Sequence, residues 1–175
     1  MNIKRMLPAS IILVCGAAWL SCGCSDLGIP SLTATPAVTD AQLYDLQAKP
    51  VHWVWFGGTA DTLTGGSTTA HEDRIRVRYN VYAATKLTDT RRVLAGAVFP
   101  DSSLIVKELY TGSVLTTIAY MYKIPGASNA APGGWVWAET DGWGNPKIPA
   151  SRAGAGCIGC HASGIDYTRM NDTHP

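Results

Sequence analysis

The sequence has little charge for its length. Charged residues make up 15% of the 175 residues, and the formal net charge is +1. A chain with so small an excess of either sign has no bulk electrostatic attraction to nucleic acid, which we therefore do not expect as a partner. Internal repeats and low-complexity tracts are also lacking. With 46% hydrophobic residues, the composition predicts one ordinary globular domain with an apolar core.

The first apolar run is too short for a transmembrane helix, which needs about 20 residues. It extends from Ile11 to Leu20, after the basic residues Lys4 and Arg5 and before the small residues of "SCGCSD". A basic start, a short apolar stretch and small residues at its end are typical of a bacterial export signal. We therefore predict a signal peptide over residues 1–24.

The end of this signal resembles a lipoprotein processing site. Cys24 follows Gly23 and is the favoured lipidation site, with Cys22 as the alternative and a simple cleaved signal as the other interpretation. Either way the mature protein is expected in the periplasm or on the outer surface of the cell envelope, held to the membrane by a lipid anchor if lipidated. A Ser-, Thr- and Pro-rich tether is predicted over 25–38, and a folded domain over 39–175.

Cysteine is scarce outside the signal. Of the five cysteines, only Cys157 and Cys160 lie in the predicted domain. A single close pair does not make a disulfide framework, so the fold has to depend on its apolar core.

Hydrophobic periodicity predicts an α+β fold that is mainly antiparallel β. The clearest strand is "RIRVRYNVYA", in which Ile75 and Val77 alternate with arginines. Thr39 and Gln42 form a capping-box signature at the start of a short helix. The expected single sheet has about five strands, with short helices packed on it and a C-terminal segment for attachment of c-type haem. Strands are predicted at 51–56, 74–83, 103–110, 114–123 and 134–139, with helices at 39–47 and within 85–96, a polar loop at 57–70 and a turn at 141–146.

The strongest chemical motif is Cys-Ile-Gly-Cys-His at residues 157–161. In an exported protein this is the attachment signature of c-type haem. Thiols at this spacing, Cys157 and Cys160, can each form a thioether with one vinyl group of the same porphyrin, while His161 reaches the iron as an axial ligand. A redox pair or disulfide does not require the histidine, and a zinc site needs further ligands that the sequence hardly offers.

The second axial position is open to several interpretations. Met170 follows His161 by nine residues, Met121 lies in a predicted strand, and His52 lies beside a tryptophan. A methionine ligand is typical of electron-transfer cytochromes, whereas core packing or a surface location explains each of these residues equally well. If none of them binds the iron, the site stays vacant for a small molecule.

Lys107 interrupts the apolar pattern of the predicted strand "DSSLIVKELY". Side chains alternate between the two faces of a strand, so Lys107 shares a face with Ile105 and Leu109. A buried lysine loses its proton more readily and becomes nucleophilic. The alternative is an edge strand from which the lysine extends past its apolar neighbours to water.

Taken together, these motifs resemble the cytochrome P460 family, which includes the nitric-oxide-binding β-type cytochromes c′. The resemblance depends on three stretches in family order, across roughly residues 70–170: "VFPDSSLIVKELY", "YMYKIPG" leading into "GGWVWAE", and "CIGCHASGIDYTRM". It implies a mainly antiparallel sheet domain, often a homodimer, that holds haem c near its C-terminus. Asp101 is followed by Ser102 where the family commonly has glycine, a difference that concerns only the turn.

The resemblance also assigns roles to residues. Founding members of the family oxidise hydroxylamine and nitric oxide, and a strand lysine matching Lys107 is covalently joined to the haem, giving the crosslinked haem P460. A carboxylate near the vacant iron site assists these enzymes, and Asp166 is our first candidate, before Glu108 and Glu139. Arg76 matches the position of a pocket arginine, although an exposed sheet face explains it equally well. Trp135 and Trp137 are expected to pack in the core or on the haem.

Three functions follow as expectations. The first is oxidation of hydroxylamine or nitric oxide, with electrons passed to an external redox partner such as a cytochrome. The second is non-catalytic binding of nitric oxide or another gas, for which relatives cap the iron site with phenylalanine; only Phe56 and Phe99 are available here. The third is electron transfer with a methionine ligand.

Overall fold

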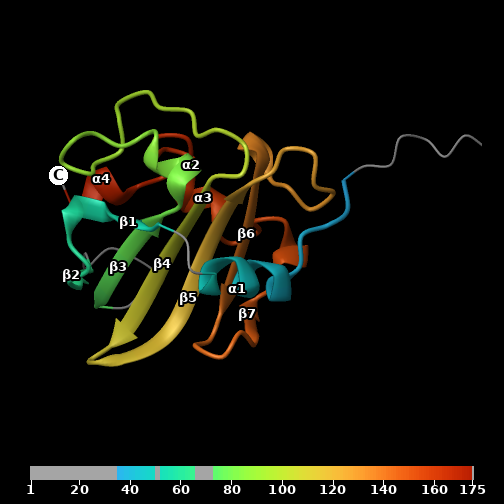
Figure 1. Ribbon diagram of the computed structural model, residues 1–175. Helices are drawn as coiled ribbons and strands as arrows, with labels where there is room; N and C mark the ends of the chain where they lie inside the picture. Colours follow the sequence, from blue (N-terminus) through green and yellow to red (C-terminus); the bar gives the residue numbers. More distant parts are fainter. Residues whose placement is uncertain (1–34, 50–51, 66–72, 175) are drawn as a thin grey trace, which may run out of the picture. The chain divides into compact units, whose positions relative to one another are not determined.

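The computed structural model describes residues 35–49, 52–65 and 73–174, all within one compact unit of the chain, Thr33–Pro175 (Figure 1). The predicted signal peptide, with Cys24, lies outside these residues, as does most of the predicted tether. In the part of the chain that is described, no helix is both long and apolar enough to cross a membrane.

An antiparallel sheet of seven strands organises the fold. Its order is β1-β3-β4-β5-β6-β7, with β2 also paired to β3. The long central strands β4 and β5 form a hairpin, and β5 continues into pairing with β6 (Figure 1). The bounds of the strands are β1 Val54–Trp55, β2 Leu63–Thr64, β3 Arg74–Tyr79, β4 Leu104–Thr111, β5 Val114–Lys123, β6 Trp135–Thr140 and β7 Pro146–Ile148.

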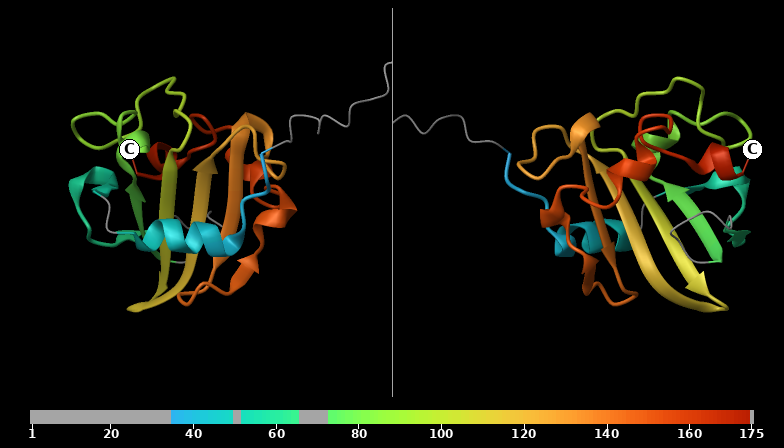
Figure 2. Two further views of the ribbon diagram at one scale, coloured as in Figure 1. Left: turned by 45° about the vertical axis from the view of Figure 1, so that its right-hand side comes forward. Right: turned by 180° about the vertical axis from the view of Figure 1, so that it is seen from behind.

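Short helices cover both faces of this sheet. Helix α1 crosses one face, and the C-terminal segment lies over the other (Figure 2). The helices are α1 Asp40–Ala48, α2 Val81–Ala84, α3 Ile158–His161 and α4 Met170–Thr173, with 3₁₀ turns η1 Phe56–Gly58, η2 Pro132–Gly134 and η3 Ala150–Arg152.

Alternation along the strands divides the apolar residues between two cores. On β4, Leu104 and Val106 pack towards α1, whereas Ile105 and Leu109 pack towards the C-terminal segment. Both sets are buried, so β4 is covered on both faces. A strand buried on both faces offers no easy route to water for a charged side chain.

The structure confirms the mainly antiparallel α+β fold, with more strands than expected. Helix α1 begins at the predicted capping box, in which Gln42 N donates to Thr39 Oγ1 and Thr39 N donates to Gln42 Oε1. Strand β5 has the predicted bounds. The predicted strand at 51–56 is shorter, because the chain turns into η1 at Phe56, and β2 lies in what was expected to be loop.

Two predictions between 74 and 96 are wrong. Strand β3 ends at Tyr79 because the Asn80 side chain caps α2, accepting from Ala83 N at 3.0 Å, and also accepts from Leu104 N. No helix forms within 85–96. There Arg91 N donates to Thr88 O, Thr88 N donates to Arg92 O, and the chain closes a tight turn instead.

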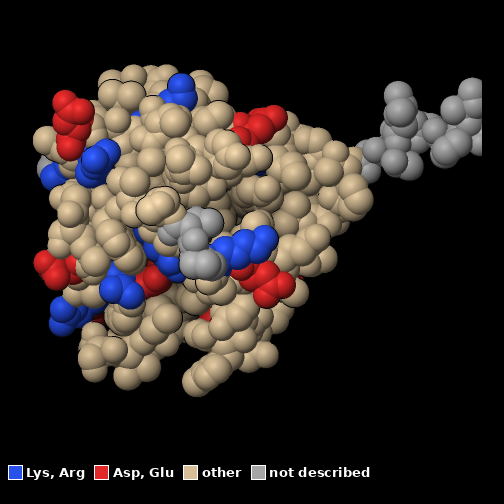
Figure 3. Space-filling model, in the orientation of Figure 1, with Lys and Arg blue, Asp and Glu red and all other residues tan. Residues whose placement is uncertain are grey.

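The face towards the viewer in Figure 3 carries basic and acidic side chains side by side, with uncharged surface around them. Across β3 and β4, Arg76 and Arg78 both form ion pairs with the buried Glu108. Over the described residues on this face, neither sign forms an extended patch.

Residues 35–38, predicted as the end of the tether, pack against the domain. Thr35 forms a parallel bridge with Ala127, and Val38 is buried. The buried side chain of Asn129 accepts from Val38 N at 3.0 Å and donates to Val38 O at 2.8 Å and to Ala150 O at 3.1 Å. This amide therefore joins the start of the domain to the turn that precedes the C-terminal segment.

Replacing Asn129 by alanine removes three hydrogen bonds and leaves buried backbone groups without partners. We expect Asn129→Ala to lower the free energy of unfolding by about 3 kcal/mol. Urea unfolding followed by tryptophan fluorescence measures it. The neighbouring Ser128→Ala variant, at an exposed position, is the control and should change stability by less than about 0.5 kcal/mol. Equal stabilities of the two variants would contradict the role given to Asn129.

Candidate functional site

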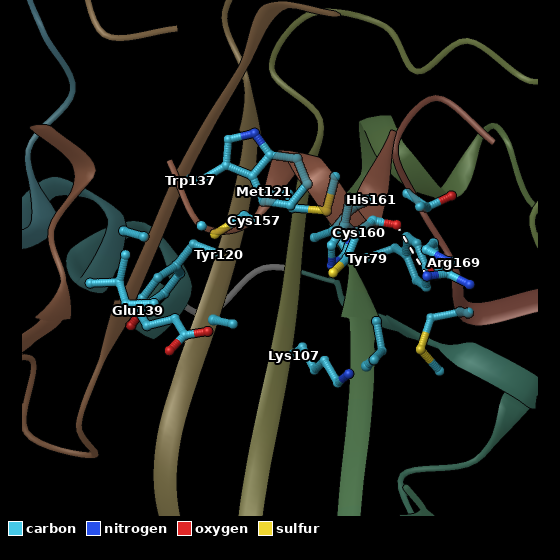
Figure 4. Close-up of a pocket in the computed structure, with 18 residues that line it drawn as sticks. Tyr79, Lys107, Tyr120, Met121, Trp137, Glu139, Cys157, Cys160, His161 and Arg169 are labelled. Carbon is cyan, nitrogen blue, oxygen red and sulfur yellow. Dashed lines mark hydrogen bonds between the residues drawn. The ribbon is translucent and has the colours of Figure 1, made fainter. Parts of the chain in front are cut away.

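A cavity of about 320 Å³ lies between the sheet and the C-terminal segment (Figure 4). Strands β3 to β6 supply one wall, and residues 156–170 supply the other. The cavity reaches the surface near Cys160 and Arg169, which are exposed. Its lining residues are Val77, Tyr79, Ile105, Lys107, Ala119, Tyr120, Met121, Trp137, Ala138, Glu139, Ile148, Gly156, Cys157, Cys160, His161, Thr168, Arg169 and Met170.

Strand register arranges the sheet wall in rows. Tyr79, Ile105, Met121 and Trp137 are paired in succession across β3 to β6 and form an aromatic and apolar row. The adjacent row reads Val77, Lys107, Ala119 and Glu139. The small side chain of Ala119 lies between the lysine and the carboxylate, so both charged groups border the same open space.

Lys107 lies in the interior of the sheet, since β4 pairs with β3 on one side and β5 on the other. The explanation of Lys107 as an edge-strand residue is therefore wrong. Burial lowers the pKa of Lys107 to about 8, against a smaller opposing effect of the Glu139 carboxylate. The neutral amine is thus far more populated near pH 7 than in an exposed lysine.

Glu139 is the carboxylate of this cavity. Burial raises the pKa of Glu139, and the positive charges of Lys147 and Lys107 partly offset that rise. A carboxyl group with a raised pKa in a largely apolar cavity is suited to accept a proton near neutral pH. Glu139 was only the third candidate from the sequence, although the alternation of "WVWAE" already places it on the face of Trp135 and Trp137.

The Cys-Ile-Gly-Cys-His motif forms the opposite wall. Its last four residues are the single turn α3, in which His161 N donates to Cys157 O. Both cysteines are free; Cys157 is half-buried and Cys160 is exposed. Gly154 precedes this turn at φ +77°, where a Cβ would lie 2.8 Å from the Trp137 ring. Only glycine lets the backbone approach the sheet so closely here.

Two neighbours, Tyr167 and Trp137, orient the His161 ring. The Nδ1 atom lies 2.8 Å from the carbonyl oxygen of Tyr167, and because a carbonyl only accepts, Nδ1 carries the hydrogen. The ring of Trp137 packs edge-on against the imidazole, with centroids 4.9 Å apart. Burial lowers the pKa of His161. This neutral tautomer presents Nε2 as the lone-pair nitrogen, as metal-bound histidines usually do.

Two buried hydrogen-bonding groups of the sheet wall favour binding of a molecule with polar groups. Tyr79 is 0% exposed and Trp137 is 4% exposed, and among the described residues neither the Tyr79 hydroxyl nor the Trp137 indole N–H has a hydrogen-bond partner. Buried polar groups are rarely left unpaired, so a bound molecule or an ordered water is the expected partner. A tetrapyrrole with polar side groups fits this wall, and the two thiols and His161 fit its attachment.

The described residues contain no cluster of three or more His, Cys, Asp or Glu side chains that could hold a metal ion by themselves. The donors present are one imidazole and two thiols on one turn, which suit a porphyrin iron. Met121 and Met170 both line the cavity, whereas His52 is exposed and does not. Both methionines therefore remain candidates for the second iron ligand.

Asp166, the first candidate from the sequence for the pocket carboxylate, does not line the cavity. Its carboxylate forms a buried ion pair with Lys123 and accepts from Phe99 N at 2.8 Å. These contacts turn the side chain away from the cavity and occupy its oxygens. The structure therefore contradicts Asp166 as the carboxylate of the pocket, and Glu139 is the carboxylate that lines it.

Of the two interpretations of Arg76, the structure contradicts the pocket arginine and supports a position on the other face of the sheet. Val77 lines the cavity, so its neighbour Arg76 faces the other side of the sheet. There the Arg76 guanidinium pairs with Glu108 and lies 5.0 Å from the centre of the Trp55 ring. The same alternation removes Glu108 from the list of pocket carboxylates. Strand alternation alone would have given this result.

No family model, no curated protein and no solved structure matches the chain. The resemblance to the cytochrome P460 family therefore stays a prediction from the motifs.

The lowered pKa of Lys107 predicts a pH-dependent stability. Between about pH 8 and 10.5 the unfolded chain binds the lysine proton and the folded chain does not, so burial of Lys107 destabilises the fold below pH 8 and ceases to do so above pH 10.5. In a Cys157→Ala/Cys160→Ala background, which cannot attach haem, Lys107→Met should raise the free energy of unfolding at pH 7 by on the order of 3 kcal/mol.

Urea unfolding at pH 7, 8, 9 and 10 measures this difference, which should shrink steadily as the pH rises. Lys147→Met, at an exposed lysine, is the control and should show no such trend. A difference for Lys107→Met that is constant from pH 7 to 10 would contradict the burial of a titrating amine.

Proposed function

We propose that the chain is a c-type haem protein of the cytochrome P460 type, which oxidises hydroxylamine, nitric oxide or both. The observation that carries the proposal is that one cavity joins the Cys-Ile-Gly-Cys-His motif, an inward-facing lysine and a carboxylate of raised pKa. These are the residue types that the proposed chemistry requires, and they come from distant parts of the sequence.

In this proposal Cys157 and Cys160 hold the haem through thioethers, and His161 binds its iron through Nε2. Tyr79 and Trp137 supply hydrogen-bond donors that are unpartnered among the described residues. When bound, the haem would supply a redox-active iron to take up electrons from the nitrogen compound, for delivery to an external acceptor. Lys107 matches the lysine that is covalently joined to the haem in the founding members of the family, and we propose the same bond here.

The chain's own contribution is proton transfer and exclusion of water. Oxidation of hydroxylamine releases protons, and Glu139 is the base that the cavity offers to accept them. Near pH 7 the remaining positive charge of Lys107 favours the carboxylate form of Glu139. Val77, Ile105 and Met121 line the cavity with apolar groups, which strengthen these electrostatic effects by keeping water out.

Gas binding is the second candidate, and the cavity favours it less. The cap that phenylalanine provides in gas-binding relatives has no counterpart among the lining residues. Phe99 instead packs in the core, with its ring 5.7 Å from Trp135, and Phe56 packs near His174. Electron transfer is the third candidate and is supported by the presence of Met121 and Met170 in the cavity wall.

The proposal retains the expected setting of the protein. Export, a location in the periplasm or on the outer surface and an anchor at Cys24 are proposed from the signal-like start of the sequence, and an external redox partner from the proposed oxidation. A homodimer follows from the resemblance.

The absorption spectrum of the ferrous protein, matured in a host competent for c-type haem, tests the haem and its lysine. We expect a strongly red-shifted main band in the wild type and an ordinary haem c spectrum in Lys107→Met, with the mass of the haem peptide reporting the extra bond. Lys147→Met is the control and should keep the wild-type spectrum.

Two other spectra would favour the competing functions. An unshifted five-coordinate spectrum with rapid nitric oxide binding would favour the gas binder. A low-spin spectrum that is lost in Met170→Ala or Met121→Ala would favour the electron carrier.

Turnover of hydroxylamine with an artificial electron acceptor tests the role of Glu139. Glu139→Gln cannot accept a proton, so we expect kcat/KM to fall by about 10²–10⁴-fold. In the wild type the rate should rise with pH as Glu139 ionises, and this rise should be absent in Glu139→Gln. Glu108→Gln, a buried carboxylate on the opposite face of the sheet, should retain wild-type turnover. Retained activity in Glu139→Gln would remove the residue from the mechanism.

A further inference from the structure

A buried ion pair outside the cavity adjoins the segment that orients His161. Lys123 Nζ lies 3.0 and 2.9 Å from the two carboxylate oxygens of Asp166, and the side chains are only 7% and 8% exposed. Lys123 also lies 4.9 Å from the centre of the Trp135 ring, whose N–H points to the same carboxylate. With Phe99 N, which also donates to it, the Asp166 side chain is therefore held by β5, β6 and the loop before β4.

The chain at Asp166 has an unusual backbone conformation. Asp166 and Tyr167 have φ values of +44° and +69°, in the left-handed region that residues other than glycine seldom adopt. Two such residues in succession are strained and persist only where the surroundings hold them. The turn is closed by Thr168 N and Thr168 Oγ1, which both donate to Ile165 O, and the ring of Tyr167 lies against Gly133.

This turn directs one backbone group at His161. The carbonyl of Tyr167, the residue after Asp166, accepts the hydrogen bond from His161 Nδ1. The direction of that carbonyl depends on the φ and ψ angles of Asp166 and Tyr167. Anchoring of the Asp166 side chain and orientation of the imidazole are thus linked through a single peptide unit.

We propose that Asp166, paired with Lys123, is a positioning residue that sets the donor strength of His161 through the Tyr167 carbonyl. The inference depends on the proposed function for its effect on iron. A hydrogen bond from Nδ1 to a carbonyl fixes the tautomer and makes Nε2 a more basic ligand, which favours ferric over ferrous iron. Without the ion pair the strained turn relaxes, the carbonyl moves, and this effect is lost.

Asp166→Asn is the sharpest test, because asparagine tolerates the left-handed region and keeps an oxygen for Phe99 N while losing the charge. In the matured protein we expect its reduction potential to rise, by about tenfold in the ferric-to-ferrous preference, which is about 59 mV for a one-electron couple. Resonance Raman spectra should show a lower iron–histidine stretching frequency.

Glu108→Gln is the matched control, since it removes the carboxylate of another buried ion pair on the opposite face of the same sheet. It should destabilise the protein without moving the potential or the stretching frequency. Lys123→Arg keeps the positive charge beside Asp166 and should retain the wild-type reduction potential and iron–histidine stretching frequency. If Asp166→Asn fails to fold because Lys123 is left unpaired, Lys123→Met/Asp166→Asn replaces the pair by neutral groups and should show the same shift.

The outcomes separate the two proposals. A haem-bearing Asp166→Asn variant with wild-type potential and stretching frequency overturns the positioning role and leaves the proposed function intact. A wild-type protein without haem overturns the proposed function, and the positioning role is then measured on the ring ¹⁵N shifts of His161. These should report an Nδ1–H tautomer in the wild type and a mixture in Asp166→Asn; identical shifts overturn the role.

Discussion

Two neighbouring residues of opposite charge, Lys107 and Glu108, lie in a strand that is covered on both faces. Because the side chains of a strand alternate, each charge has to be stabilised on its own side of the sheet. Glu108 is stabilised by Arg76 and Arg78. Lys107 faces the cavity, where the nearest opposite charge is Glu139, across Ala119. The cavity lies over this row, which combines one small residue with two charged ones.

The features of the sequence that depend on local chemistry predicted the structure well. A capping box specifies a helix start by two reciprocal hydrogen bonds, and α1 begins where Thr39 and Gln42 indicate. Alternation of apolar residues gave the central strands and the inward direction of Lys107. The compact motif at 157–161 gave three neighbouring residues of the candidate site, which the C-terminal segment brings to the same cavity as Lys107.

Features that depend on distant partners were not predictable in the same way. The Asp166 side chain is turned away from the cavity by Lys123 and Phe99, which lie far from it in sequence. Asn80 ends a strand early because its side chain serves both Ala83 N and Leu104 N. Arg76 is a different case, because its face follows from the alternation of its own strand, whereas the pocket role came from the family resemblance alone.

The place of Glu139 has a consequence for how such a protein changes over evolutionary time. Its side chain lines the cavity from β6, next to a register shift in the pairing with β7, so a substitution there alters the cavity wall while the backbone pairing of Glu139 with Ala119 involves no side-chain atom. A single nucleotide change can therefore remove the acidic group without removing a backbone hydrogen bond of the sheet. In the proposed function, this one side chain therefore separates turnover of a nitrogen compound from mere binding of it, within the same sheet.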